Sequence, residues 1–203
     1  MAANADDVID QAICQLGEAK TLEDVQEIVR CAARRAVNAH GATMVLLEGD
    51  QCYYLDEDSM SPLWKGMRFP AANCISGWAM LNGETVVIPD IRVDSRIPQK
   101  AYRPTFVRSL VMTPIRRESP IGAIGAYWAL CHCATDVEVG ALEALGAAAG
   151  EVMVHRGLPS TAPPYAPLVN ACVRPTPAAS GSRAASAGTG APADGRCGVG
   201  RGW

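Results

Sequence analysis

The chain has 203 residues, 49% of them hydrophobic, and a formal net charge of −3 at pH 7, which suits one domain with extensions. Residues 157–203 hold four arginines and a single acid, a net charge of +3, which leaves −6 for residues 1–156. A mildly acidic globular part gives no electrostatic reason to expect binding to nucleic acid or to a membrane surface.

Two amphipathic helices are predicted at the start of the chain. Apolar residues recur at helical spacing over residues 5–18 and again over residues 21–38. Thr21 and the later Asp24 are typical of a capping box at the start of the second helix. Gly41 supports an end just before it, because glycine suits the left-handed conformation that often follows a helix.

Several strands are predicted next. Residues 42–48 read as a buried strand that turns at Gly49-Asp50 into a return strand over residues 51–55, forming a hairpin. A further short strand is expected at residues 65–69, and a short helix is expected at residues 76–81.

The next predicted element is a strand over residues 85–88. The polar segment 90–106 (DIRVDSRIPQKAYRPTF) follows it, and connections of this length are often lids or binding segments. A strand pair over residues 109–116 and 121–130 leads to a last amphipathic helix over residues 135–154. Since sequential strands joined by tight turns form antiparallel sheets, the order of elements indicates the α+β class.

The composition changes at the end of the last helix. Residues 156–203 contain seven of the 14 prolines and eight of the 19 glycines, and such a segment cannot bury enough apolar area to offset its chain entropy. We therefore expect one domain over residues 1–156 and a disordered tail over residues 157–203. The tail is either a flexible extension or the out-of-frame end of a truncated gene.

The start of the chain and its hydropathy bear on the compartment. No basic, apolar leader opens the sequence, and no stretch approaches the ~18 apolar residues of a membrane helix. We therefore expect a cytoplasmic protein. There the eight cysteines should stay reduced, so most of them are predicted to be buried thiols rather than parts of a disulfide framework.

The run Cys131-His132-Cys133 combines side chains that bind zinc or copper. In an extended strand, however, Cys131 and Cys133 lie on the face of Tyr127, and His132 points the other way. No second pair of ligands lies nearby in the sequence. The sequence therefore predicts no metal site here, and the run is expected to join the last strand to the last helix.

Several short motifs follow one another in the second half of the domain. They are the small-residue helix start Ser76-Gly77-Trp78-Ala79, the strand end Val87-Ile88-Pro89-Asp90, an acidic loop ending near Arg96, and the strand motifs Ser109–Ile115 and Gly122–Gly125. With these motifs, residues 5–155 resemble a GAF domain, a small-molecule sensor module. The resemblance is greatest to the GAF domains of bacterial sensor histidine kinases.

The resemblance implies a fold and a mode of action. It implies a central antiparallel sheet with the terminal helices on one face and a ligand pocket, roofed by residues 70–106, on the other. It also implies a homodimer formed through the terminal helices and a signal passed to a histidine kinase of a two-component system or to another partner. The alanine-rich faces of the predicted helices agree independently, because small side chains allow close helix packing.

The sequence contains no complete catalytic motif: it has no kinase domain, phosphate-binding loop or nucleophile elbow. One enzymatic alternative is the GAF family of free methionine-(R)-sulfoxide reductases. Their reactive cysteine lies just before a strand like the one that begins at Ser109. In this chain that segment is AYRPTFVRS, which contains no cysteine. Cys74 is then the most plausible reactive thiol, since a helix N-terminus lowers a thiol pKa. A third alternative is a structural dimerisation module without a ligand.

The expected site uses residues of the pocket segment and of the sheet beneath it. The candidates are Phe69, Cys74, Trp78, Asp90, Arg92, Arg96, Tyr102, Arg103, Phe106, Arg108 and Tyr127. The aromatic members would line the pocket or pack in the core. The arginines would bind an anionic ligand through forked hydrogen bonds or pair with the acids of their own loop. The identity of the ligand or cofactor stays unknown.

Overall fold

The computed structural model describes residues 4–158, and its centre is a six-stranded antiparallel sheet. The strand order is β3-β2-β1-β6-β5-β4. The strands are β1 (Gly41–Glu48), β2 (Gln51–Ser59), β3 (Arg68–Pro70), β4 (Val86–Ile88), β5 (Ser109–Ile115) and β6 (Gly122–Trp128). The helices are α1 (Ala5–Glu18), α2 (Leu22–Ala36), η1 (Ala71–Asn73), α3 (Ile75–Asn82), α4 (Gln99–Tyr102) and α5 (Asp136–His155). This arrangement confirms the α+β class.

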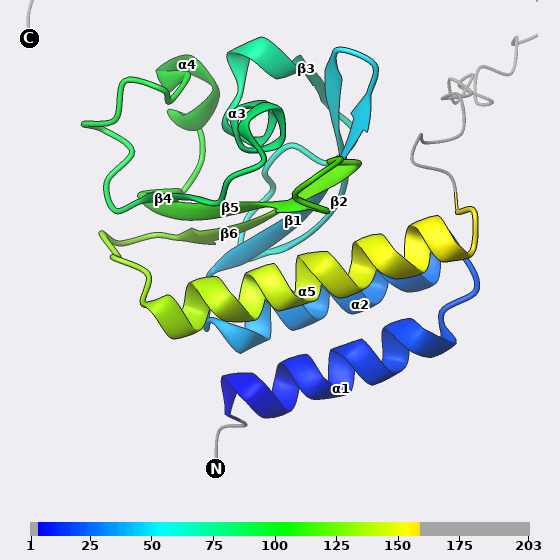
Figure 1. Ribbon diagram of the computed structural model, residues 1–203. Helices are drawn as coiled ribbons and strands as arrows, with labels where there is room; N and C mark the ends of the chain where they lie inside the picture. Colours follow the sequence, from blue (N-terminus) through cyan, green and yellow to red (C-terminus); the bar gives the residue numbers. More distant parts are fainter. Residues whose placement is uncertain (1–3, 159–203) are drawn as a thin grey trace, which may run out of the picture. The chain divides into compact units, whose positions relative to one another are not determined.

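The three long helices cover one face of the sheet (Figure 1). Leu16 of α1, Val25 of α2 and Leu142 of α5 are fully buried in one hydrophobic core, together with sheet residues such as Met44 and Ile124. The terminal helices therefore pack on one face of the sheet, as the resemblance implied.

Helices α2 and α5 both begin with a capping box. The hydroxyl of Thr21 accepts from the backbone N–H of Asp24, and the Asp24 carboxylate accepts from the backbone N–H of Thr21 in return. Thr135 and Glu138 make the same exchange at the start of α5. Each exchange satisfies two backbone donors that the first turn of a helix leaves free. The first box was predicted from the sequence.

The other face of the sheet carries a second core beneath β3, η1, α3, α4 and their loops (Figure 1). Alternation along each strand separates the two cores. In β6, Trp128 belongs to the helix side and Tyr127 to the opposite side. The short helix α3 ends at Gly83, whose φ of +64° is the left-handed conformation that glycine adopts at no steric cost.

Several predicted boundaries are wrong, and the short strand expected at residues 65–69 begins only at Arg68, as β3. Strand β2 continues past Leu55 to Ser59, because its polar end pairs with the first residues of β1. The segment 90–106 is not a continuous loop, since it contains α4. Strand β6 was predicted to end at residue 130, but it ends at Trp128. Trp128 pairs with Ser109 of β5, and this is the last pair of the ladder between the two strands.

Within residues 4–158, none of the helices combines the length and apolarity that a membrane crossing requires. The tail predicted over residues 157–203 lies outside the described residues from residue 159 onward, so its disorder stays a prediction.

Candidate functional site

An aromatic cluster forms the centre of the second core. The ring of Trp64 lies 5.4 Å from that of Tyr54, 4.8 Å from that of Tyr102 and 5.7 Å from that of Tyr127. Phe69 joins the cluster at 5.5 Å from Tyr54. All four pairs meet edge to face, the arrangement that aromatic quadrupoles favour. The Trp64 indole N–H also donates to the carbonyl of Ala101, at 3.3 Å, and so ties the cluster to α4.

A small cavity lies inside this cluster. Its lining comes from the sheet, from the loop between β2 and β3, from the start of α3 and from α4 with the residue before it: Tyr54, Trp64, Phe69, Cys74, Pro98, Ala101 and Tyr102. Its volume is about 10 Å³, roughly the space that one water molecule needs. The expected pocket is therefore occupied by the protein's own aromatic side chains in this structure.

The polar groups of the cluster form a short chain at the start of α3. The Ser76 hydroxyl lies 3.3 Å from the Cys74 sulfur and 3.3 Å from the Tyr54 hydroxyl. Cys52, on β2, is fully buried in the same core. Deeper in the sheet, the Tyr127 hydroxyl bonds to the Thr43 hydroxyl at 2.9 Å.

These hydrogen bonds shift the acidity of the two thiols in opposite directions. The hydrogen bond from Cys52 lowers the pKa of Cys74 to about 6, with further help from the Ser76 hydroxyl and the backbone N–H groups of Gly77 and Ser76. Conversely, the pKa of Cys52 is raised, because hydrogen bonding to Cys74 favours its protonated form and because burial disfavours its thiolate. Cys74 is thus the thiol that ionises first.

The small residues of the α3 start explain this geometry. A side-chain carbon added at Gly77 would lie 1.9 Å from the carbonyl oxygen of Ala71, far inside van der Waals contact. Only glycine lets α3 begin directly against η1, which places Cys74 at the N-cap position, facing the cavity. The Ser-Gly motif is therefore a packing requirement of the site.

The structure gathers some of the predicted site residues and separates others. Phe69, Cys74 and Tyr102 line the cavity, and Tyr127 contacts the cluster through Trp64. Trp78 is half-buried outside the cavity, with the Arg96 guanidinium 4.8 Å from its ring centre.

The predicted arginines do not surround this cavity. Arg96 pairs with Asp94 at 2.6 Å, and Arg108 pairs with Asp90 at 2.7 Å. The second pair lies near a separate surface groove of about 320 Å³, which is lined by Arg92, Thr105, Phe106, Val107, Arg108, Ala129, Leu130 and Cys131. Arg103 is exposed at the end of α4.

Cys52, Tyr54 and Trp64 are among the residues of the site that were missed from the sequence, as are the lining residues Pro98 and Ala101. The first two carried a signal, because alternation in the run QCYYL places both on one face of a strand. Trp64 lies between strands, where no periodicity applies. The one indication that Trp64 belongs to a core or a site was that a tryptophan stands in the loop sequence SPLWKG.

The Cys131-His132-Cys133 run does not converge on one point. His132 stacks on Trp128 at 4.4 Å and bonds to the Glu138 carboxylate at 2.9 Å. Cys131 accepts from the Arg108 guanidinium at 3.3 Å. Among residues 4–158, no group of three or more histidine, cysteine or acidic side chains is placed to hold a metal ion.

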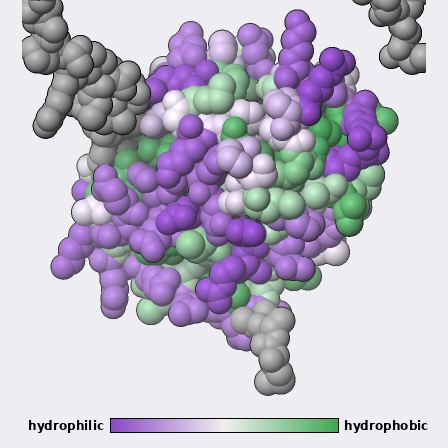
Figure 2. Space-filling view, turned by 180° about the vertical axis from the view of Figure 1, so that it is seen from behind, coloured by the Kyte–Doolittle hydropathy of each residue, from purple (hydrophilic) through white to green (hydrophobic). Residues whose placement is uncertain are grey.

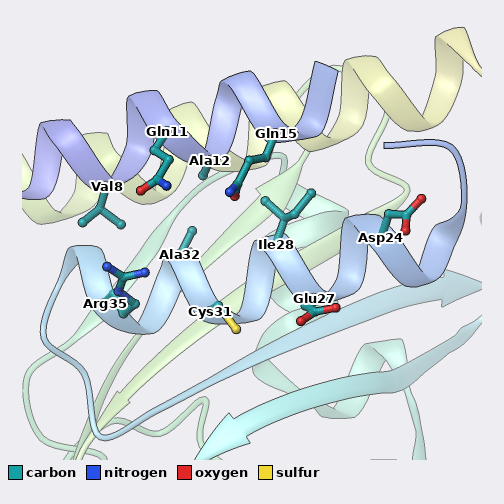
Figure 3. A pocket seen from close by; sticks show the side chains of 10 residues that line it. All are labelled: Val8, Gln11, Ala12, Gln15, Asp24, Glu27, Ile28, Cys31, Ala32 and Arg35. Carbon is teal, nitrogen blue, oxygen red and sulfur yellow. The ribbon is translucent and has the colours of Figure 1, made fainter. Parts of the chain in front are cut away.

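A larger groove of about 330 Å³ lies between α1 and α2, away from the aromatic cluster. Figure 3 shows Gln11 and Gln15 reaching from α1 toward α2. Asp24, at one end, already serves the capping box. The groove is open and partly polar, and none of the expected site residues lines it.

Comparisons with known proteins agree with this architecture. A family model described as GAF domain matches residues 19–154. Among solved structures, the GAF domain of an Acinetobacter phosphoenolpyruvate-protein phosphotransferase is 14% identical, with a TM-score of 0.66, and the match covers 77% of this chain and 97% of that chain.

Two further solved structures are similar. Free methionine-R-sulfoxide reductase from Neisseria meningitidis, in complex with its substrate, is 15% identical, with a TM-score of 0.65 and coverage of 77% and 98%. A GAF domain from A. aeolicus in an inactive state is 17% identical, with a TM-score of 0.61 and coverage of 75% and 96%. No curated protein matches the sequence.

Proposed function

The chain belongs to the GAF domain family, and from this premise we propose that it is a non-catalytic sensory domain for a small molecule. The ligand site we propose is the aromatic cluster on the sheet face opposite α1, α2 and α5. Signalling then runs through the terminal helices, by dimerisation or through a partner such as a histidine kinase.

The observation that carries the proposal is that, within residues 4–158, only short elements and loops cover the sheet face with the aromatic cluster. Long helices cover one side of the sheet, whereas the aromatic cluster is covered by short elements and the loops between them. Segments with little regular structure open locally at a lower free-energy cost than packed helices. Displacing α4 would enlarge the cavity, with apolar rings around it and the hydroxyls of Tyr54 and Ser76 as its polar groups. Apolar walls with few polar groups are typical of ligand sites.

A thermal-shift screen against a metabolite library tests the proposal. A ligand at a hundredfold excess over its Kd adds ~2.7 kcal/mol to the free energy of unfolding, so it should raise the melting temperature. An Ala101→Leu variant fills the cavity and should lose the shift, whereas the exposed Ala72→Leu should keep it. If no metabolite stabilises the protein, the alternative of a structural module without a ligand is favoured.

The exposed side of α5 supports the proposed dimer. Val137 and Val154 are 62% and 51% exposed, and Gly140, Ala144 and Ala147 are exposed between them. Val137, Gly140, Ala144 and Ala147 are three or four residues apart and line up one apolar stripe along the helix, and the exposed Glu151 separates this stripe from Val154. A stripe of small and apolar side chains suits close packing against the same stripe of a second copy.

A second candidate function is thiol-dependent reduction of free methionine-(R)-sulfoxide. The observations that favour it are the lowered pKa of Cys74, its position at the cavity, and the similarity to the Neisseria reductase. Turnover of the free sulfoxide with a thiol reductant, lost on Cys74→Ser but kept on Cys14→Ser, would establish it. Absence of turnover in the wild-type protein would exclude it and leave the sensory proposal intact.

A further inference from the structure

The surface groove that contains Arg92 and Arg108, which we call the arginine groove, lies at the end of the sheet where β5 begins and β6 ends. Arg108 comes directly before β5, residues 129–131 come directly after β6, and residues 105–107 complete the lining. Its volume of about 320 Å³ is that of a small-molecule site. Of the described residues, none lines both this groove and the cavity of the aromatic cluster.

We propose that the arginine groove binds a small organic oxyanion, a carboxylate or a phosphate monoester that carries an apolar group. The guanidinium groups of Arg92 and Arg108 hold the oxyanion, and Phe106 and Leu130 contact the apolar group. The site does not depend on the proposed sensory function, because it lies outside the aromatic cluster and requires no displacement of α4.

Hydrogen bonds fix the backbone of the groove. The N–H of Arg108 donates to the carbonyl of Trp128 at 2.7 Å, and the carbonyl of Arg108 accepts from the N–H of Ile91 at 2.9 Å. The Ser109 hydroxyl donates to the carbonyl of Leu130 at 2.8 Å. A ligand therefore meets walls that are already ordered, which lowers the entropic cost of binding.

The guanidinium of Arg108 is held in place from two sides. Its Nη2 atom donates to the Asp90 carboxylate at 2.7 Å, and its Nε atom donates to the Cys131 sulfur at 3.3 Å. Its Nη1 atom makes no hydrogen bond within residues 4–158, and the side chain is 24% exposed. Arg108 therefore keeps donors for a ligand, in the planar arrangement that suits carboxylates and phosphates.

Arg92 supplies the second positive charge. Its backbone N–H donates to the Asp90 carboxylate at 3.0 Å, whereas its guanidinium makes no hydrogen bond or ion pair in the described part of the chain. The described residues that line the groove include no acid. With Asp90 counted, two positive charges and one negative charge leave a net charge of +1, which attracts anions.

The other two arginines of the same segment do not contribute to this site. The guanidinium of Arg96 donates to the Asp94 carboxylate twice, at 3.0 and 2.6 Å. Arg103 is exposed and is not part of the lining. Of the four arginines expected to bind an anion, Arg92 and Arg108 are therefore the pair that faces one groove.

Apolar side chains beside the arginines determine the body of the ligand. Leu130 is 70% exposed at the edge of the groove, Phe106 is half-buried and Val107 is buried. An apolar group that covers Leu130 and Phe106 removes apolar surface from water, which is favourable. An oxyanion with an apolar group therefore fits the groove better than a bare inorganic anion does.

The exposed thiol of Cys131, which lines the groove, reports on binding in the whole protein. We would measure how fast iodoacetamide alkylates Cys131, by peptide mass spectrometry, with phenyl phosphate or benzoate present. A probe at ten times its Kd leaves about one site in eleven free, so alkylation should slow about tenfold with one or both anions. The anion that protects at the lower concentration identifies the preferred oxyanion.

Two controls belong to this measurement. Benzamide has the shape of benzoate without its charge and should not protect Cys131. The exposed Cys14, on α1, should react at an unchanged rate with every probe. The proposal is overturned if neither anion protects Cys131, if benzamide protects it as well as benzoate does, or if Cys14 is protected to the same extent.

Variants test the role of the arginines. Arg92→Gln and Arg108→Gln each remove one guanidinium and should raise the Kd of the protecting anion about tenfold. The exposed Arg92 makes no side-chain bond within residues 4–158, so Arg92→Gln remains usable if Arg108→Gln does not fold. Arg103→Gln removes the same charge outside the groove and should keep the wild-type Kd. A wild-type Kd in Arg92→Gln would also overturn the proposal.

Discussion

The lowered pKa of Cys74 couples its ionisation to folding. In the unfolded chain a thiol has a pKa of about 8.5, whereas in the fold the pKa of Cys74 falls to about 6. The folded state therefore releases the proton first, and the free energy of unfolding rises with pH between these values. This contribution is complete above about pH 8.5 and is lost as the pH falls through about 6.

We therefore expect the stability difference between wild type and Cys74→Ser to grow in favour of the wild type from about pH 6 to about pH 8.5. Urea unfolding of both proteins across this range measures it. The exposed Cys14→Ser variant is the control and should follow the wild type. Parallel pH profiles for wild type and Cys74→Ser would show that the fold does not favour the thiolate.

Gly77 gives a second prediction about a single residue. A methyl group at this position would lie 1.9 Å from the Ala71 carbonyl oxygen and 2.5 Å from its Cα atom, and both are backbone atoms that cannot turn aside. We expect Gly77→Ala to cost ~2–4 kcal/mol of unfolding free energy. Gly17, on an exposed part of α1, has no atom within 4 Å of the added carbon.

Gly17→Ala is the matched control, and it should be neutral or stabilising by ~0.5–1 kcal/mol because alanine favours the helix. Chemical denaturation of both variants gives the comparison. Equal stabilities would mean that the start of α3 can move away from η1, and the position of Cys74 would then not depend on Gly77.

Single residues also show what the sequence could tell about the site. Phe69, Cys74, Tyr102 and Tyr127 were expected at the pocket from the family resemblance, and the structure brings all four to one cluster. Cys52 was not expected there, because its partner depends on where the start of α3 meets β2. Alternation along a strand gives the face of a residue but not its neighbour across the core.

At the scale of elements, the ion pairs between α2 and β2 give a third prediction. The Asp56 carboxylate lies 3.0 Å from Nε of Arg30, an atom that is itself buried, and also pairs with Lys65. The Asp56 side chain is 9% exposed and that of Arg30 is 31% exposed, so the carboxylate is the buried partner. Asp56→Ala removes it and leaves the buried Nε atom of Arg30 without its partner, which should cost ~1–3 kcal/mol of unfolding free energy.

Asp58 is the control on the same strand. It pairs with Arg34, and the side chains of Asp58 and Arg34 are 27% and 33% exposed. Water can therefore solvate the Arg34 guanidinium when the carboxylate is removed. We expect Asp58→Ala to cost ~0–1 kcal/mol. Thermal and urea unfolding of the two variants would measure the two losses of unfolding free energy. A cost for Asp58→Ala as large as that for Asp56→Ala would contradict the role given to burial.

The helices were predictable from the sequence and the polar strand end was not. Stripes of apolar residues and the Thr21–Asp24 pair placed α1 and α2 closely, because these signals are local. The second half of β2, Asp56–Ser59, is polar, and it becomes strand through pairing with β1 and, at Asp56, through the ion pairs with Arg30 and Lys65. Such partners lie far away in sequence, so no local pattern reports them.

At the scale of the whole molecule, the sheet separates two cores with different covers. One side is closed by long helices, and the other by short segments around an aromatic cluster. Seen from behind, hydrophilic side chains cover most of the surface, and hydrophobic ones form scattered small groups (Figure 2). Helix α5 lies at the front in Figure 1, so this helix is on the opposite side of the molecule from the view in Figure 2.

The stripe gives the last prediction, which concerns the oligomeric state. Ala147 is exposed near the middle of the stripe, so Ala147→Glu should leave the fold of a single copy intact. In a dimer with twofold symmetry, the same surface of each copy meets the other. Two added carboxylates would then be brought together and desolvated, which is costly for like charges. We expect the wild type to be dimeric and Ala147→Glu to be monomeric by sedimentation equilibrium, with similar melting curves at low concentration.

Ala72→Glu makes the same chemical change at an exposed position on the other side of the sheet, and it should remain dimeric. If both variants dimerise like the wild type, the stripe on α5 is not the interface. If the wild type is itself monomeric, dimerisation cannot carry the signal. The output of the domain would then have to pass through contact with a different protein, and the exposed stripe of α5 would be the first surface on which to seek that contact.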